Sequence, residues 1–171
     1  IQVAHAFTVN AAHTESDFFA AVDDLEREMG NKGSGHIGNV ELTTGLYYGY
    51  VAIDLPLLHR NLTGGAPWAP NPLLEEVVAR ILHLIATVSP GAKLGSTAPH
   101  AYAQLVLVER GEEQPRTLAN AFLHPVIEQG GLLANTYQAL GSHLSQIAQM
   151  YGKNPEHRFA AMGPVEKLGL S

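Results

Sequence analysis

The clearest strand pattern of the chain lies in residues 40–55, VELTTGLYYGYVAIDL. One side of this stretch carries Val40, Leu42, Leu46, Tyr48, Tyr50 and Ala52, and the other side carries Glu41, Thr43, Gly45, Tyr47, Gly49 and Val51. Alternation with a period of two is typical of a half-buried β-strand. Two glycines on the second side remove side-chain bulk, so we expect another backbone or a ligand to approach the strand there.

The segment before this strand predicts a second strand followed by a helix. Residues 1–10, IQVAHAFTVN, alternate and therefore favour a half-buried strand. Thr14 and Asp17 then fit a capping box at the start of a helix of about four turns. The apolar stripe of that helix consists of Phe18, Val22, Leu25 and Met29.

The segment after residues 40–55 predicts a helix, a strand and further helices. Asn71 as N-cap and Pro72 as first helical residue mark a helix over residues 72–88. We predict a strand over 102–109, a short helix near 117–123 and a longer helix near 132–151. No period is clear from Lys153 onward. The run 40–109 is then a βαβ unit with a right-handed crossover.

This order of elements predicts an α+β fold with a ferredoxin-like sheet. Such a sheet needs one strand and one helix more than the chain provides. Strand-like alternation begins at once at Ile1, which is not a Met. We therefore expect the missing first strand and helix to precede Ile1 in a longer protein, where they would cover the open sheet edge.

The composition narrows the classes of function. The 171 residues are 46% hydrophobic and 15% charged, which suits a folded domain with a real core. The formal net charge is −6, whereas a free-standing nucleic-acid binder is usually basic. The absence of cysteine excludes disulfides and thiolate metal sites. With no signal peptide pattern and no apolar run near the roughly 20 residues of a membrane helix, we expect a cytoplasmic location.

The run GSGHIG at residues 33–38 matches the G-x-G-x-x-G fingerprint of dinucleotide-binding loops. That fingerprint requires a helix to start from the loop, because the pyrophosphate lies on the helix N-terminus. Here a helix is expected before the loop and a strand after it, so we interpret the run as the tip of a projecting hairpin. Ile37 at such a tip is costly in water unless it inserts into a partner, for example between nucleic-acid bases.

Three further features of the sequence could form a binding site. Lys93 and Thr97 belong to a polar loop, AKLGSTAPH, which is either a set of phosphate contacts or an ordinary surface loop. The nine histidines show no metal-ligand spacing, so we expect neither a metal nor a cofactor. Three tyrosines near residue 48 fit a base-stacking platform, although packing in the sheet is the favoured interpretation.

Four stretches as a set resemble a known family. They are QVAHAFTVNAAHTESDFFAAVDDLE (2–26), GHIGNVELTTGLYYGYVAIDL (35–55), PGAKLGSTAPH (90–100) and LANAF (118–122). Together they resemble the C-terminal half of the CasC family, the backbone subunit of the type I-E CRISPR Cascade complex. The resemblance runs in order from residue 1 to about residue 125.

The resemblance implies an RRM-like palm with a palm strand at 1–10, a thumb at 11–40, a palm core at 41–125 and a helical region at 126–171. It implies a non-catalytic subunit that polymerises head to tail along a CRISPR RNA and presents the guide to target DNA. Other Cascade subunits would be further partners. The thumb would fold over the guide of a neighbouring copy and flip a base. The RNA contacts are then expected at Lys32, His36, Ile37, Lys93 and Thr97.

Two other classes of function stay open at this stage. One is an enzyme that binds a nucleotide at the GSGHIG loop. The other is a structural domain that pairs through its sheet edge and never touches RNA.

Overall fold

The computed structural model describes residues 1–21, 36–89, 100–152 and 155–170. The strands are β1 (Gln2–Val3), β2 (Phe7–Thr8), β3 (His13–Ala21), β4 (His36–Thr44), β5 (Tyr47–Tyr48), β6 (Val51–Ala52), β7 (Leu105–Arg110) and β8 (Glu156–Ala161). The helices are α2 (Leu55–Thr63), α3 (Pro72–Thr87) and α5 (Leu132–Tyr151), with short 3-10 helices η1 (Ala119–Phe122) and η2 (Val165–Leu168). The predicted α+β fold with antiparallel pairing is confirmed, whereas its ferredoxin-like arrangement stays a prediction.

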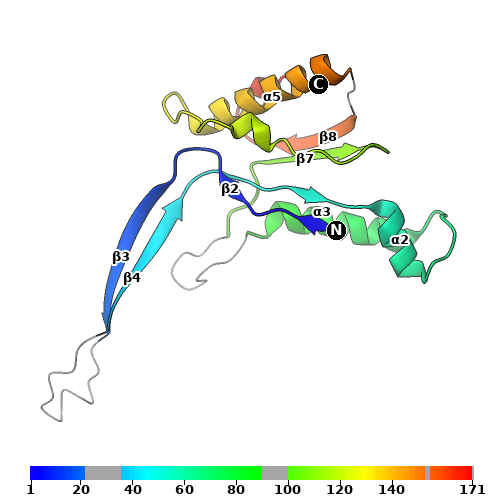
Figure 1. Cartoon of the computed structure of the whole chain (residues 1–171), viewed down its shortest axis with the longest axis horizontal. Helices are drawn as coiled ribbons and strands as arrows, with labels where there is room; N and C mark the ends of the chain where they lie inside the picture. The colour runs from blue at the N-terminus through cyan, green and yellow to red at the C-terminus, as the bar shows by residue number, and fades with distance from the viewer. Residues whose placement is uncertain (22–35, 90–99, 153–154, 171) are drawn as a thin grey trace, which may run out of the picture.

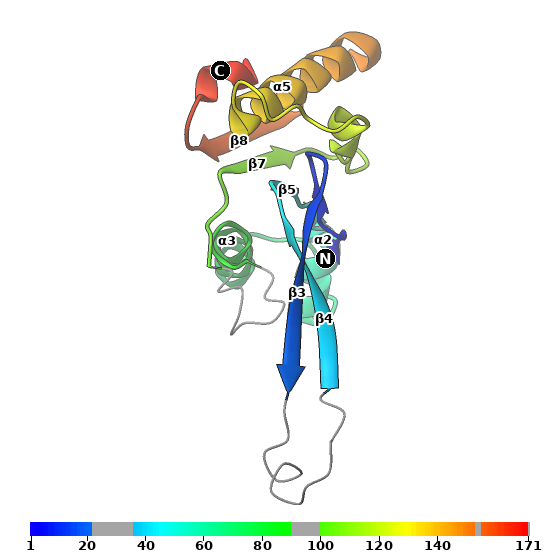
Figure 2. The ribbon, with the colours of Figure 1, turned by 90° about the vertical axis from the view of Figure 1, so that its left-hand side faces the viewer.

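The strands pair in twos along an extended ribbon and a separate layer. β1 pairs with β6 and β2 with β5, and these short ladders form a ribbon through the middle of the molecule (Figure 1). The β7–β8 pair and α5 lie on one side of the ribbon, and α2 and α3 lie on the other (Figure 2). The β3–β4 hairpin continues from the ribbon and projects away from the body. None of the described helices is both long enough and apolar enough to cross a membrane.

The predicted two-sided pattern is confirmed from Glu41 to Tyr50, but it is wrong at Val51, which is half-buried like its neighbour Ala52. Leu42, Leu46, Tyr48, Tyr50 and Ala52 are half-buried, whereas Glu41, Thr43, Gly45, Tyr47 and Gly49 are exposed. The strand is interrupted between β4, β5 and β6 rather than continuous. The alternation survives these breaks because the burial of one side depends on the layer packed against it.

The main core lies between α5 and the elements around it. Its buried residues are Leu118, Tyr137, Leu140, Leu144 and Leu168. Tyr137 is 1% exposed, and its hydroxyl lies 2.9 Å from the carbonyl oxygens of Gln104 and Met162. These two residues flank the β7–β8 ladder, so one phenol anchors the helix to both strands.

Both helices that follow the ribbon begin as their sequences direct. The Asn71 side chain accepts hydrogen bonds from the backbone N–H groups of Leu73 and Leu74, and Pro72 opens α3. The predicted helix entry is therefore confirmed. Asp54 caps α2 in the same way, through a bond from the Leu57 N–H, and Gly64 ends that helix with a positive φ of 66°. We had not predicted α2 from the sequence.

The helix predicted to begin near Thr14 is wrong as far as the structure describes it. Residues 13–21 form the strand β3, paired over its whole length with β4, and residues 22–29 lie outside the described residues. Phe18, which we placed on a buried stripe, is 70% exposed. Helical spacing of apolar residues was misleading here because pairing with a distant strand overrode the local pattern.

The predicted βαβ unit is also wrong. Among the described residues β7 pairs with β8, which lies in the C-terminal segment where we found no period. The signal for β8 is short but present: His157, Phe159 and Ala161 are half-buried and alternate with exposed residues. Six residues of alternation were too few to stand out, and the partner strand lies about 50 residues away.

Candidate nucleic-acid interface

The β3–β4 hairpin is the most projecting feature of the described chain (Figures 1 and 2). Its two strands pair in nine steps, from His13 opposite Thr44 to Ala21 opposite His36. At about 3.4 Å per residue such a ladder extends roughly 30 Å, far enough to contact a second molecule. The predicted thumb boundaries, 11–40, stay a prediction, although the projecting hairpin lies within and just beyond them.

The strand β4 begins at His36, within the GSGHIG run and directly after its second glycine. No helix therefore starts from this loop, so the pyrophosphate-binding arrangement of a dinucleotide site is missing on the side that requires it. The strand expected after the loop is confirmed. His36 and Ile37 occupy the far end of the hairpin, where Ile37 is opposite Ala20.

Phe18 is a surface feature that the sequence analysis missed. It lies opposite Asn39 in the ladder, and its position falls on the same face of the hairpin as position 37, because residues two apart on a strand share a face. Its aromatic side chain is 70% exposed on a projecting ladder and is therefore accessible to other molecules. The doublet of Phe18 and Phe19 directly after the polar run His13–Asp17 could have indicated it.

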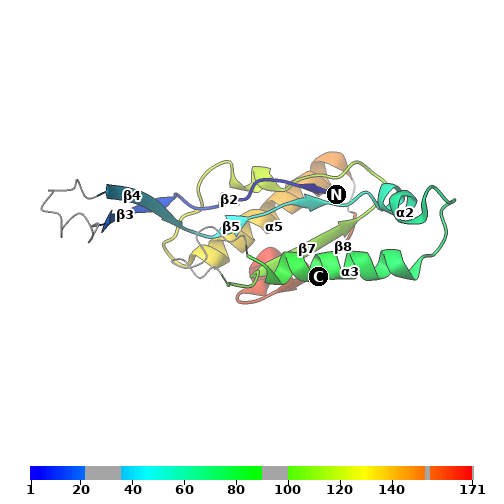
Figure 3. The ribbon, with the colours of Figure 1, turned by 90° about the horizontal axis from the view of Figure 1, so that it is seen from below.

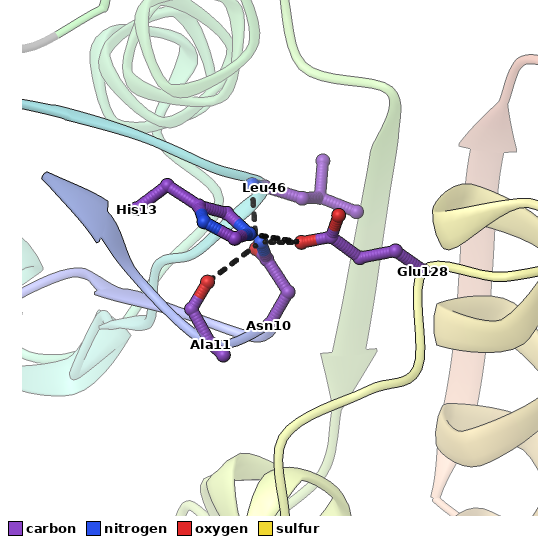
Figure 4. Close-up of polar contacts among 5 residues, drawn as sticks. All are labelled: Asn10, Ala11, His13, Leu46 and Glu128. Carbon is purple, nitrogen blue, oxygen red and sulfur yellow. Dashed lines mark hydrogen bonds and ion pairs between the residues drawn. The ribbon is translucent and has the colours of Figure 1, made fainter. Parts of the chain in front are cut away.

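The base of the hairpin is fixed by a polar cluster (Figure 4). Asn10 is 5% exposed and donates from Nδ2 to Oε1 of Glu128 at 2.7 Å, while its Oδ1 accepts from the Leu46 N–H at 3.2 Å. His13 Nε2 lies 3.2 Å from the same Glu128 oxygen. These contacts join both strand ends of the hairpin to the segment that precedes α5, so they set the direction in which the hairpin projects.

At Gly45 other side chains of the protein lie close to the backbone of the ribbon. A Cβ at position 45 would lie 2.8 Å from Cγ2 of Thr8 and 3.1 Å from Oδ1 of Asn10. The close approach expected at this glycine is therefore made by side chains of the chain itself. Gly49 has open space around it, with no heavy atom within 4 Å of a Cβ built there.

The second predicted contact segment, which carries Lys93 and Thr97, lies outside the described residues, as does Lys32. The residues on either side of this segment are joined by hydrogen bonds. Ser89 Oγ donates to the Ala101 carbonyl at 2.5 Å, and the Ala103 N–H donates to the Ala86 carbonyl at 2.9 Å. Ser89 and Ala101 therefore lie close together at the C-terminal end of α3, which runs toward the hairpin side of the molecule (Figure 3).

Tyr48 of the ribbon packs inside the protein, as the favoured interpretation expected, whereas Tyr47 is exposed. Tyr48 lies between Phe7 and Phe122, with ring centroids 5.4 Å and 5.5 Å away. Its hydroxyl accepts from the Leu118 N–H at 2.9 Å. Burial raises the pKa of Tyr50, and the nearby Tyr48 and Glu109 raise it further.

Several cations of the described chain are already engaged by carboxylates. Arg116 binds Glu109 through two hydrogen bonds, Nε to Oε2 at 3.0 Å and Nη2 to Oε1 at 2.6 Å. This pairing raises the pKa of the Arg116 guanidinium. Arg80 lies 3.1 Å from Glu76 in the next turn of α3. No group of three or more His, Asp or Glu in the described segments is arranged to hold a metal ion.

One family model and several solved structures match this chain. A family model described as "CT1975-like protein" matches residues 1–168. A chain of a "CRISPR RNA-guided surveillance complex" is similar with a TM-score of 0.75 and 26% identity, over 98% of this chain and 63% of that chain. A chain of a "CRISPR RNA-guided surveillance complex, pre-nicking" is similar with a TM-score of 0.72 and 27% identity, over 95% of this chain and 42% of that one. No curated protein matches. The chain therefore spans less than two thirds of these solved chains.

Proposed function

The chain belongs to the family of CT1975-like proteins, and from this membership we propose that it is a non-catalytic, RNA-binding backbone subunit of a CRISPR RNA-guided surveillance complex. The observation that carries the proposal is the projecting β3–β4 hairpin on a chain that is similar, over 98% of its length, to a chain of such a complex. The assignment to a type I-E Cascade complex, and a cytoplasmic location, stay predictions from the sequence.

The proposed role divides the chain into a body and a contacting arm. The body would be the palm, with its strand at 1–10 and its core at 41–125, followed by the helical region at 126–171. The arm would be the thumb at 11–40. Its rigid root at Asn10 and Glu128 supports this division, because an arm that acts on a neighbour needs a fixed direction.

The proposed contacts follow from what backbone recognition requires. Guide pairing reads sequence, so the protein needs only contacts to phosphates and to the shape of the strand. Lys32, His36, Lys93 and Thr97 supply cationic and hydroxyl donors for that purpose. Ile37 supplies an apolar wedge that unstacks a base from the guide–target pairing.

Assembly along the guide follows from an arm that reaches beyond its own body. A contact between unlike surfaces of two copies does not close on itself and continues as a filament. The proposed partners are therefore the CRISPR RNA, further copies of this chain, target DNA through the guide, and the other subunits of the complex.

The decisive experiment compares particle size with and without CRISPR RNA. We expect RNA to convert the purified protein into a particle whose mass grows in steps with the length of the guide. A protein that remains the same size at every guide length would exclude the backbone role and would favour a structural domain that does not bind RNA.

A second experiment tests the wedge at position 37. Ile37→Ala should lower the fluorescence of a base analogue placed at the flipped position, because a smaller side chain leaves the base stacked. Thr43→Ala, on the same strand but near the base of the hairpin, is the matched control. An unchanged signal in Ile37→Ala particles that still assemble would remove the wedge role and leave the backbone role standing.

A further inference from the structure

The helix α2 lies at the end of the molecule opposite the hairpin (Figures 1 and 3). Its residues line a cavity of about 260 Å³. Its lining includes Asp54, Leu57, His59, Arg60 and Trp68. Its described lining comes from residues 54–68 and includes no residue of β3 or β4. An inference about this cavity therefore does not depend on the guide contacts proposed above.

His59 is the first sign of a ligand. Its side chain belongs to a residue that is only 3% exposed, yet no hydrogen bond to the ring is found among the described residues. No fully enclosed side-chain nitrogen or oxygen of those residues lacks a partner, so the ring nitrogens must meet solvent. The cavity that His59 lines provides that contact. A buried imidazole normally has a partner for each nitrogen, and here the ligand would supply one.

Trp68 provides a stacking surface next to this imidazole. Its ring lies 4.9 Å from the His59 ring, centroid to centroid, at an interplanar angle of 47°. The residue is nonetheless 60% exposed, so most of the indole is open to solvent. An exposed indole beside a polar edge suits a flat, polar ring, and stacking of a base on an aromatic side chain contributes about 1–3 kcal/mol.

Arg60 and Asp54 add charges of opposite sign to the lining of the cavity. The exposed Arg60 has no ion pair within the described segments, unlike Arg80 and Arg116. One carboxylate oxygen of Asp54 accepts from the Leu57 N–H at 2.8 Å, which leaves the other oxygen available to an amino group. A guanidinium binds a phosphate through two parallel hydrogen bonds.

We propose that this cavity is a nucleotide-binding site. The base stacks on Trp68 and presents its polar edge to His59 and Asp54, and the phosphate binds Arg60. An aromatic side chain from a protein partner would fill the same space but would leave the His59 nitrogens and the Arg60 guanidinium without acceptors or donors, which disfavours it. The nucleotide is either free or the end of a single strand.

Trp68 is the only tryptophan of the chain, so its fluorescence reports on this site alone. We expect AMP to quench it saturably and adenosine to bind about tenfold or more weakly, since the phosphate bond to Arg60 is lost. In Arg60→Gln the two ligands should bind alike. Arg80→Gln removes the same charge from the exposed face of α3 and should preserve the difference between them.

An oligoadenylate strand in place of AMP distinguishes the two sources of the base. Quenching by AMP identifies a free nucleotide, and quenching by the strand alone identifies a strand end; either supports the site. Absence of quenching by both at millimolar concentration, in a protein with native circular dichroism, would overturn the proposal. Quenching only by a peptide of residues His13–Ala21 would overturn it in favour of a protein partner. Loss of RNA-driven assembly with intact AMP binding would overturn the proposed function alone.

Discussion

Asn10 joins three segments that are far apart in the sequence. Its side chain contacts the Ala11 carbonyl, the Leu46 N–H and the Glu128 carboxylate, while only 5% of the residue is exposed. A buried amide that loses its partners leaves donors and acceptors without bonds. This residue therefore controls both local stability and the direction of the hairpin.

We predict that Asn10→Ala lowers the free energy of unfolding by about 1–3 kcal/mol, because the Leu46 N–H and the Glu128 carboxylate lose their partner. Urea denaturation measures the change. Asn39→Ala, an exposed asparagine on β4, is the matched control and should change stability by less than about 0.5 kcal/mol. Equal effects of the two variants would contradict the role of the cluster in Figure 4.

Tyr137 links stability to alkaline pH. Burial raises the pKa of its phenol above the usual value of 10.0. The unfolded chain then loses this proton before the folded protein does, so the contribution to stability is complete below pH 10.0 and falls as the pH rises above it. Burial raises the pKa of Tyr50 as well, and its contribution has the same sign.

We predict that Tyr137→Phe shows a shallower loss of stability above pH 10.0 than the parent protein. At neutral pH the variant should lose about 1 kcal/mol, because the bonds to the Gln104 and Met162 carbonyls disappear. Urea denaturation across the pH range separates the two effects. A parallel pH dependence in both proteins would refute the assignment to Tyr137.

At the scale of elements, α5 and η2 approach each other unusually closely. A Cβ at position 141, in the middle of α5, would lie 2.8 Å from the carbonyl carbon of Leu168. Glycine is normally a poor choice in a helix, where alanine is about 1 kcal/mol better. Here the backbone of η2 occupies the space that a side chain would need.

We predict that Gly141→Ala destabilises the protein by about 1–3 kcal/mol, the reverse of the usual effect in a helix, because η2 must move away. Thermal unfolding followed by circular dichroism is the measurement. Gly49→Ala is the control, since the space around that position is open. A stabilised Gly141→Ala variant would show that α5 and η2 pack less closely than described.

Elements with local signals could be predicted, and those that depend on a distant partner could not. The α5 bounds, Leu132–Tyr151, agree with the predicted range near 132–151 because 20 residues of helical spacing average out local exceptions. The start of α3 was marked by Asn71 and Pro72. We did not predict the strands β3 and β8, because each is stabilised by pairing with one distant strand. The residues of β3 alone fit a helix, and those of β8 showed us no pattern.

At the scale of the whole molecule, Tyr48 connects the ribbon to the α5 layer. It stacks against Phe7 within the ribbon and against Phe122 of η1, and its hydroxyl accepts the Leu118 N–H. Leu118 belongs to the main core. The ribbon therefore contacts the main core through Tyr48, whose ring packs against other aromatic rings and whose hydroxyl forms a hydrogen bond.

We predict that Tyr48→Phe costs about 0.5–1.5 kcal/mol because the Leu118 N–H loses its acceptor. The matched control is Tyr47→Phe, whose exposed hydroxyl only donates to the Thr43 carbonyl and should matter little. Chemical denaturation of both variants is the measurement. If the two substitutions prove equivalent, the hydroxyl of Tyr48 does not help to hold the layers together.

Some residues of the candidate site can be proposed from short stretches of sequence, and others come together only in the folded structure. His36 and Ile37 were proposed from the sequence, because a glycine-rich run that carries an apolar residue is a local signal, and their contacts stay a prediction. The polar root at Asn10 and Glu128 was not, since 118 residues separate the two side chains. Lys32, Lys93 and Thr97 lie outside the described residues and stay predictions. The cavity at His59 and Trp68 could not be predicted either, because the spacing of residues in the sequence does not show that these side chains come together.

The sequence by itself determined the α+β class, the two-sided pattern of residues 41–50, the bounds of α5 and the rejection of GSGHIG as a dinucleotide loop. Periodicity and caps are properties of neighbouring residues, so they can be interpreted without a structure. Only the tertiary structure decided that residues 13–21 form a strand, that β7 pairs with β8, and that Asn10 fixes the hairpin. Each of these depends on contacts between distant segments, whose free energy outweighs local propensity once both partners are present.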